Sequence, residues 1–194
     1  SAITAPGQFV NIQLPGKFLR RPISICNWTK DALLLLVRVV GEGTHDLVRC
    51  VPGTELDVLS GLGNGFDLAK GGAHPILLGG GIGIAPLYGL AQRMLEAGIA
   101  PTVGLGFRSG GDAFYLEEFG KLGCRLMVAT EDGSLGTKGF VTGSGPSCAG
   151  VRLRLRLRPH PHAEGRPRPA PAHRRAVQLR GPDGLRLRRL HGLL

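Results

Sequence analysis

Residues 74–86 read His74-Pro75-Ile76-Leu77-Leu78-Gly79-Gly80-Gly81-Ile82-Gly83-Ile84-Ala85-Pro86, an apolar run that ends in a cluster of glycines. The pattern predicts a buried strand, a tight turn whose backbone can approach a ligand closely, and the start of a helix. Pro86 suits the first helical turn, where its missing N–H costs nothing. A helix N-terminus after such a turn favours phosphate binding. The glycines that would contact a phosphate are Gly79, Gly80, Gly81 and Gly83. A glycine-rich turn without a ligand is the alternative.

Around this stretch, residues 71–142 alternate between strand and helix patterns. Apolar residues from Leu87 to Leu95 recur at helical spacing, and Gly98 is placed to end that helix. The other expected elements are a strand at 102–107, a short helix at 112–119 and a strand at 125–129. Such alternation predicts a parallel sheet covered by helices, with a ligand at the carboxyl ends of its strands. The polar segment 131–134 is interpreted as a turn, with a ribose contact as the alternative.

The first 70 residues read as β structure. Alternating or apolar runs predict strands at 9–14, 23–28, 32–40 and 55–59, separated by glycine-containing turns. Short strands at this spacing predict a small antiparallel barrel or sandwich. The sequence opens on Pro6-Gly7-Gln8-Phe9 with no strand before it, so we expect the barrel to lack its first strand.

Charge divides the chain unevenly. The formal net charge is +10 over 194 residues, yet residues 1–150 sum to zero and the excess lies in the arginines of 151–194. This distribution describes a neutral globular protein with a basic tail. Four scattered cysteines without metal-ligand spacing favour a reducing compartment. No apolar run has the length of a membrane span, so we expect no membrane association.

A basic strand end at Arg20-Arg21 is the second stretch of chemical interest. An arginine side chain presents a planar fork that suits phosphate oxygens. Ser24, two residues after Pro22, is placed to present a hydroxyl to a ring nitrogen. By itself, an exposed basic strand end explains the same residues.

Taken in series, the motifs resemble a known family. They are Pro6-Gly7-Gln8-Phe9, Arg21-Pro22-Ile23-Ser24, Gly43-Thr44, Leu62-Gly63-Asn64-Gly65-Phe66, the glycine stretch, Gly106-Phe107-Arg108-Ser109, 113–119 and 130–141. Over residues 6–142 the chain resembles the ferredoxin-reductase flavoproteins and, among these, the electron-transfer subunits of type B (NAD-dependent) dihydroorotate dehydrogenases. Ser60-Gly61 departs from the Gly-Pro that this family has at the corresponding turn.

The resemblance implies an FAD-binding barrel at 1–70 and a Rossmann-like NAD domain at 71–142. Arg21, Pro22, Ile23 and Ser24 would bind the pyrophosphate and the flavin edge. Leu36, Val37 and Arg38 would line the flavin and the adenosine, and Gly43 and Thr44 would hold phosphate. The stretch from Gly79 to Pro86 would receive NAD. The flavin would exchange a hydride with nicotinamide and pass electrons through a [2Fe–2S] cluster to an FMN-containing catalytic subunit, in cytoplasmic pyrimidine biosynthesis.

The tail at 143–194 departs from this family. It is rich in arginine, proline and leucine and lacks aromatic residues, so we expect disorder and no specific nucleic-acid binding. A reading-frame shift between Val141 and Val151 is our preferred explanation. A shift of one base permits cysteines at the codons of Leu185, Leu190 and Leu193, the C-x4-C-x2-C spacing of plant-type [2Fe–2S] ligands. In the frame given, these cluster ligands are absent.

Two alternatives stay open. The first is the flavin subunit of a ferredoxin–NADP oxidoreductase, which would prefer NADPH. The second, from another class, is an inactive flavodomain whose basic tail binds nucleic acid.

Overall fold

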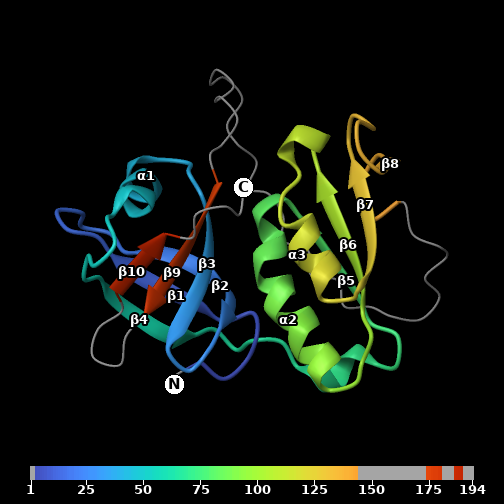
Figure 1. The fold of residues 1–194 in the computed structure, drawn as a ribbon, viewed down its shortest axis with the longest axis horizontal. Helices are drawn as coiled ribbons and strands as arrows, with labels where there is room; N and C mark the ends of the chain where they lie inside the picture. The colour runs from blue at the N-terminus through green and yellow to red at the C-terminus, as the bar shows by residue number, and fades with distance from the viewer. Residues whose placement is uncertain (1–2, 144–173, 181–185, 190–194) are drawn as a thin grey trace.

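The computed structural model describes residues 3–143, 174–180 and 186–189. Figure 1 shows an antiparallel sheet on the left and a parallel sheet with helices on the right. The strands are β1 (Phe9–Gln13), β2 (Arg21–Trp28), β3 (Ala32–Arg38), β4 (Asp57–Leu62), β5 (Ile76–Gly80), β6 (Thr102–Phe107), β7 (Arg125–Thr130), β8 (Thr137–Lys138), β9 (Arg174–Arg180) and β10 (Arg186–Arg189). The helices are α1 (Glu42–Arg49), α2 (Ala85–Glu96) and α3 (Leu116–Lys121), with 3-10 turns at Leu68–Gly71, Gly81–Ile84 and Gly110–Asp112.

The first sheet has the order β10-β9-β3-β2-β1-β4, and all its pairs are antiparallel. Its strands alternate because one face covers an apolar core: Val10 and Ile12 on β1 are fully buried, and Asn11 between them is not. Helix α1 closes this core with Leu47. This sheet confirms the predicted small antiparallel, barrel-like half.

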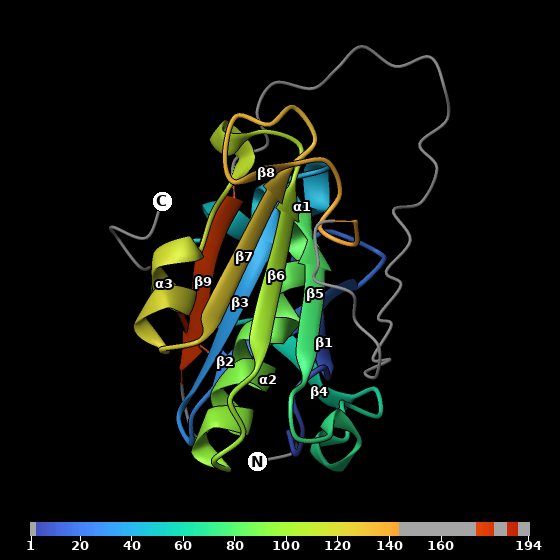
Figure 2. The ribbon, with the colours of Figure 1, turned by 90° about the vertical axis from the view of Figure 1, so that its right-hand side faces the viewer.

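The second sheet has the order β5-β6-β7-β8, and its pairs are parallel. Helices α2 and α3 pack on one side of it, as Figures 1 and 2 show together. Leu87, Leu90 and Met94 on α2 are buried against Val103 and Leu105 on β6. Parallel strands need such crossover helices to return the chain to the same edge, so this sheet confirms the predicted α/β half.

Two local expectations differ from the structure. The turn expected at 41–44 continues as α1 to Arg49, where the sequence predicted no element, because Gly43 and Leu47, four residues apart, are buried on one helical face. The tail was expected to be without structure, yet 174–180 and 186–189 are strands, and β9 pairs with β3 over seven residues. Val177 and Leu179 stand two residues apart in β9, a spacing that suits a strand, and the edge of β3 offers unpaired backbone groups. The rest of the tail, including the predicted frame shift, lies outside the described residues.

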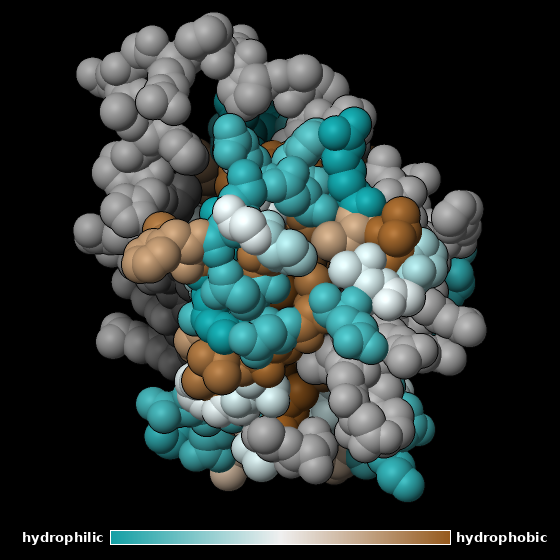
Figure 3. All heavy atoms as spheres, turned by 90° about the vertical axis from the view of Figure 1, so that its left-hand side faces the viewer, coloured by the Kyte–Doolittle hydropathy of each residue, from teal (hydrophilic) through white to brown (hydrophobic). Residues whose placement is uncertain are grey.

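The surface over the first sheet carries apolar patches between polar ones (Figure 3). The exposed large apolar side chains of this half are Phe18, Leu19, Val40, Val51 and Leu59. None of the helices in the described ranges combines the length and apolar composition needed to cross a membrane.

Candidate functional site

The first candidate surface is one face of the β2–β3 pair. Ile25 pairs with Leu35, and both point into the core of the first sheet. Since side chains alternate between faces, the residues on either side of this pair lie on the opposite face. Four predicted flavin-site residues share that opposite face, here called the outer face: Pro22, Ser24, Leu36 and Arg38. The structure therefore brings these four together.

Two other predicted residues lie on the core side of the same strands. Val37 is 1% exposed within the core of the first sheet, and Ile23 packs against that core. Their side chains have little surface to offer a ligand. On the outer face these two residues can offer a ligand only their backbone groups.

Arg21 lies against the first turn of α1. A Cβ added at Gly43 would come within 1.9 Å of Arg21 Nε and 2.5 Å of Cζ, so the guanidinium rests directly on the Gly43 backbone. Arg21 Nη1 also donates a hydrogen bond to the Leu19 carbonyl oxygen at 2.6 Å. Two residues that the sequence linked only through a resemblance are thus in direct contact. A guanidinium beside a helix start is a favourable place for an anionic group.

Arg38 carries an unsatisfied donor. Its Nε is buried and has no hydrogen-bond partner in the part of the chain that the structure describes. Leaving a buried donor unpaired costs about 1–3 kcal/mol, so such a group calls for a partner; the other unpaired buried side-chain atom of the described residues is Asn11 Oδ1 on β1. A phosphate or another acceptor on the outer face would satisfy it.

Thr44 has a structural role that the sequence did not predict, and its predicted phosphate contact stays a prediction. Its hydroxyl accepts hydrogen bonds from the N–H groups of Val40 (2.9 Å) and Gly41 (3.2 Å) and donates to the Gly41 carbonyl oxygen (3.0 Å). These bonds hold the approach to α1 in shape. The hydroxyl is therefore engaged by backbone, and Thr44 supports the turn on which Arg21 rests.

The second candidate surface is the glycine turn, residues 79–83. Strand β5 ends at Gly80, a 3-10 turn follows, and α2 begins with Pro86 in its first turn, as the sequence predicted. Gly79 must lack a side chain, because a Cβ there would lie 2.6 Å from Leu87 Cδ1. Gly81 has a φ of +53°, which glycine adopts without strain. The turn lies at the carboxyl ends of parallel strands, where ligands bind in open α/β sheets.

The polar segment 131–134 is a turn with internal partners. Ser134 Oγ accepts a hydrogen bond from the Gly110 N–H at 2.7 Å and donates one to Asp132 Oδ1 at 2.6 Å. The hydrogen bonds from Ser134 lower the pKa of Asp132. These contacts join the turns that follow β6 and β7. They give the segment a structural role without any ligand.

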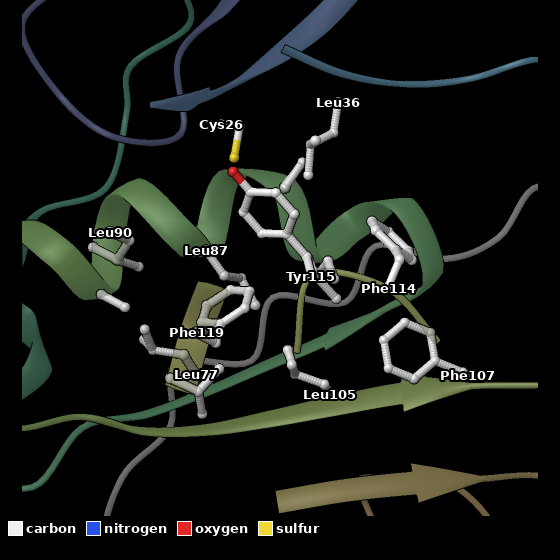
Figure 4. Close-up of a cluster of buried hydrophobic side chains, with 14 of the residues drawn as sticks. Cys26, Leu36, Leu77, Leu87, Leu90, Leu105, Phe107, Phe114, Tyr115 and Phe119 are labelled. Atoms are coloured by element: carbon white, nitrogen blue, oxygen red, sulfur yellow. The ribbon is translucent and has the colours of Figure 1, made fainter. Parts of the chain in front are cut away.

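A buried contact between the two halves has no signal in the sequence. Figure 4 shows the Tyr115 hydroxyl pointing at the Cys26 sulfur, above the aromatic cluster of the second sheet. Tyr115 has a φ of +64°, a strained value for a residue with a side chain. Burial, in which Tyr115 takes part, raises the pKa of the Cys26 thiol to about 12 and raises that of Tyr115 as well. Both groups are therefore neutral at physiological pH.

The burial of the Cys26 thiol predicts a loss of stability at alkaline pH. Folding raises the pKa of Cys26, so as the pH rises the unfolded chain releases the thiol proton before the folded chain does. The contribution of this thiol to the free energy of unfolding is therefore fully present below pH 9 and is lost as the pH rises towards 12. We expect the free energy of unfolding of wild type to fall more steeply between pH 8 and 11 than that of Cys26→Ala. Urea titrations at several pH values measure this difference. Parallel pH profiles of the two proteins would contradict it.

Metal ligands do not gather in the described ranges. Cys26 and Cys124 are free thiols, and no group of three or more histidine, cysteine, aspartate or glutamate side chains is placed to hold a metal there. The described residues therefore do not fit an iron–sulfur cluster.

An antiparallel, barrel-like sheet followed by a parallel sheet with a glycine turn defines the class of ferredoxin-reductase-like flavoproteins. A solved structure of an NADH-dependent reduced ferredoxin–NADP oxidoreductase matches with a TM-score of 0.65 and 36% identity, covering 72% of this chain and 51% of that one. No family model matches the chain.

In sequence the chain is related to one branch of this class. It is 44% identical over 147 residues to the dihydroorotate dehydrogenase B (NAD(+)) electron transfer subunit of Geobacillus sp. (strain WCH70), covering 72% of this chain and 57% of that protein. It is 46% identical over 144 residues to the subunit of Bacillus cereus (strain B4264), covering 71% and 55%. The chain spans little more than half the length of these relatives. The predicted resemblance is confirmed: over the matched residues the chain is similar to the electron transfer subunits of dihydroorotate dehydrogenase B.

Proposed function

We propose that the chain is the flavin- and NAD-binding part of an electron-transfer subunit that serves a dihydroorotate dehydrogenase in cytoplasmic pyrimidine biosynthesis. The observation that carries the proposal is the buried, unpaired Arg38 Nε on the outer face of β2 and β3. The similarity to named electron transfer subunits supports the same role. The partner in this proposal is an FMN-containing catalytic subunit.

The proposal divides the chain as the sequence predicts. Residues 1–70 hold FAD, residues 71–142 hold NAD, and residues 143–194 are an aberrant tail. Strands β9 and β10 extend the first sheet from that tail. The outer face and the glycine turn then serve two different cofactors.

The residues of the chain bind and orient these cofactors. Arg38 and the Arg21–Gly43 pair supply donors for the FAD phosphates, and Ser24 presents a hydroxyl on the same face as Arg38. The glycine turn offers backbone N–H groups to the dinucleotide. A bound flavin supplies hydride and single-electron chemistry, so no side chain needs to act as an acid or base. The proposal routes no step through an iron–sulfur cluster, and we expect the chain as written not to reduce the catalytic subunit.

Arg38→Met separates the binding role of Arg38 from its packing. Methionine fills a similar volume but removes the unpaired donor, so we expect the ligand-free protein to be at least as stable as wild type. A charge-assisted hydrogen bond contributes about 1.5–3 kcal/mol, so FAD affinity should fall by about 10- to 100-fold. Fluorescence titration with FAD and urea unfolding without FAD measure the two effects.

For Arg38→Met we therefore expect FAD affinity to fall while the stability of the ligand-free protein stays the same or rises. Unchanged FAD affinity would contradict the assigned site. Failure of the wild-type protein to bind FAD at all, judged by its visible absorbance, would overturn the proposed function.

A flavin subunit of a ferredoxin–NADP oxidoreductase is the second candidate, favoured by the 36% identity to the solved NADH-dependent enzyme of that kind. Anaerobic reduction of the bound flavin by NADH and by NADPH compares the two. Preference for NADPH supports the oxidoreductase. Preference for NADH fits both candidates, since the solved oxidoreductase is itself NADH-dependent, and the partner subunit that accepts electrons from the reduced flavin then separates them. The coding DNA across residues 141–151 tests the frame shift separately.

A further inference from the structure

Helix α2 and strand β2 join the two halves of the protein along a short shared surface. Three successive residues of β2, Cys26, Asn27 and Trp28, contact three residues on one face of α2, Gly89, Gln92 and Arg93. Gln92 and Arg93 stand three and four residues after Gly89, about one helical turn, so the three residues lie on one face of the helix. We call this surface the α2–β2 contact.

The centre of the α2–β2 contact is backbone against backbone. A Cβ added at Gly89 would lie 2.6 Å from the carbonyl oxygen of Cys26 and 3.7 Å from Asn27 Cα. Real Cβ atoms do not approach an oxygen that closely, so any side chain at this position would push the helix from the strand. Gly89 sits inside a helix, where glycine is less favourable than alanine. Close approach is a physical reason for a glycine at this position.

Two polar interactions, made by Gln92 and Arg93 one turn after Gly89, hold α2 against β2. Asn27 Nδ2 donates a hydrogen bond to Gln92 Oε1 at 2.7 Å. One turn from Gly89, the Arg93 guanidinium lies 4.7 Å from the centroid of the Trp28 ring, and Glu96 holds that guanidinium at 2.7 Å. A cation over an aromatic face is attracted by the negative charge of the ring face. The contact is therefore specific in rotation as well as in distance.

Both elements of the α2–β2 contact continue into the candidate sites. Strand β2 carries two residues of the outer face: Pro22, four residues before Cys26, and Ser24, two residues before it. Helix α2 follows directly on the glycine turn. A shift of α2 along or away from β2 therefore moves one site relative to the other.

We propose that Gly89, with Gln92 and Arg93, is a positioning residue that sets the distance between the flavin and nicotinamide sites. The proposal rests on the proposed function, since it needs both cofactors to bind. Transfer between bound reactants requires reacting atoms about 3–3.5 Å apart, and a displacement of about 1 Å can cost 100-fold in rate. The cost falls on transfer between cofactors and leaves the binding of each one intact.

The test compares two helical glycines. Gly89→Ala introduces the clash, and Gly120→Ala on α3 introduces a Cβ with nothing within 4 Å. Both changes raise helix propensity, so Gly120→Ala controls for that effect. Trp28 is the sole tryptophan of the chain, and its emission reports directly on the α2–β2 contact.

For Gly89→Ala we expect a red-shifted Trp28 emission, FAD affinity within threefold of wild type, and at least a tenfold slower anaerobic reduction of bound FAD at saturating NADH. Gly120→Ala should match wild type in all three. Wild-type reduction rates in Gly89→Ala, or an equal loss of FAD affinity and rate, would overturn the proposal. If Gly89→Ala does not fold, Gln92→Met removes the hydrogen bond from Asn27 across the contact, together with the exposed one to Glu96 on the same helix, and should slow reduction without loss of FAD.

Failure of the proposed function gives a different result. Wild-type protein that binds no FAD overturns the electron-transfer assignment and the positioning role with it. Wild-type protein that binds FAD, combined with an unshifted Trp28 emission in Gly89→Ala, overturns the positioning role alone.

Discussion

Replacing Phe119 by alanine is expected to destabilise the protein by about 3–5 kcal/mol. The Phe119 ring is fully buried on α3 and forms edge contacts with Tyr88 (centroids 5.3 Å apart) and Tyr115 (6.3 Å). Figure 4 shows the ring among the leucines of α2 and of the parallel strands. Truncation removes its apolar contacts and leaves a cavity that the surrounding sheet and helix cannot fill by collapse. Urea unfolding, with equal slopes for both proteins, measures the loss.

Phe18→Ala is the matched control for this prediction. Phe18 is 96% exposed on the first half, so removal of its ring should change the free energy of unfolding by no more than about 0.5 kcal/mol. Equal losses in the two variants would mean that the aromatic cluster below Tyr115 does not form the core of the second half.

Local patterns in the sequence predicted the elements of the parallel half correctly. Strand β5, the glycine turn and the Pro86 start of α2 follow from apolar runs, glycines and a proline that act over a few residues. The end of α2 near Gly98 follows in the same way, since this glycine has the positive φ of a helix end. Sequence reasoning succeeds here because neighbouring residues alone decide these elements.

Features that depend on distant residues could not be predicted in the same way. Helix α1 is short and interrupts a run of strands. It is stabilised by Leu47, which packs into a core that the surrounding strands build. Strand β9 is placed by the edge of β3, which lies more than a hundred residues earlier in the sequence. The Cys26–Tyr115 contact and the α2–β2 contact join the two halves and leave no local pattern.

The candidate site shows the same division. The sequence placed Arg21 and Gly43 in one site only through a resemblance, whereas the structure places one directly on the other. The burial of Val37 and the capping role of Thr44 are visible only in three dimensions. Side-chain direction, rather than residue type, decides which predicted residues reach the outer face.

Gly43→Ala is expected to weaken FAD binding by about 10- to 100-fold with little loss of stability. The added Cβ would lie 1.9 Å from Arg21 Nε, and the guanidinium is the mobile end of a flexible side chain. Arg21 therefore moves away from α1 at low cost, because the three atoms nearest the added Cβ all belong to its flexible side chain. The affinity loss corresponds to about 1.5–3 kcal/mol, the contribution of a hydrogen bond to a charged group. FAD fluorescence titration and urea unfolding measure the two effects.

Two further variants decide whether Gly43 acts through Arg21. Gly41→Ala adds a Cβ with nothing within 4 Å in the same turn, so it should keep wild-type FAD affinity. Arg21→Ala should weaken binding as Gly43→Ala does. Because both changes remove the same guanidinium, the double variant should lose no more affinity than Arg21→Ala alone. Additive losses in the double variant would show instead that the Gly43 backbone contacts the ligand independently of Arg21, and the anion site would then be the start of α1 itself.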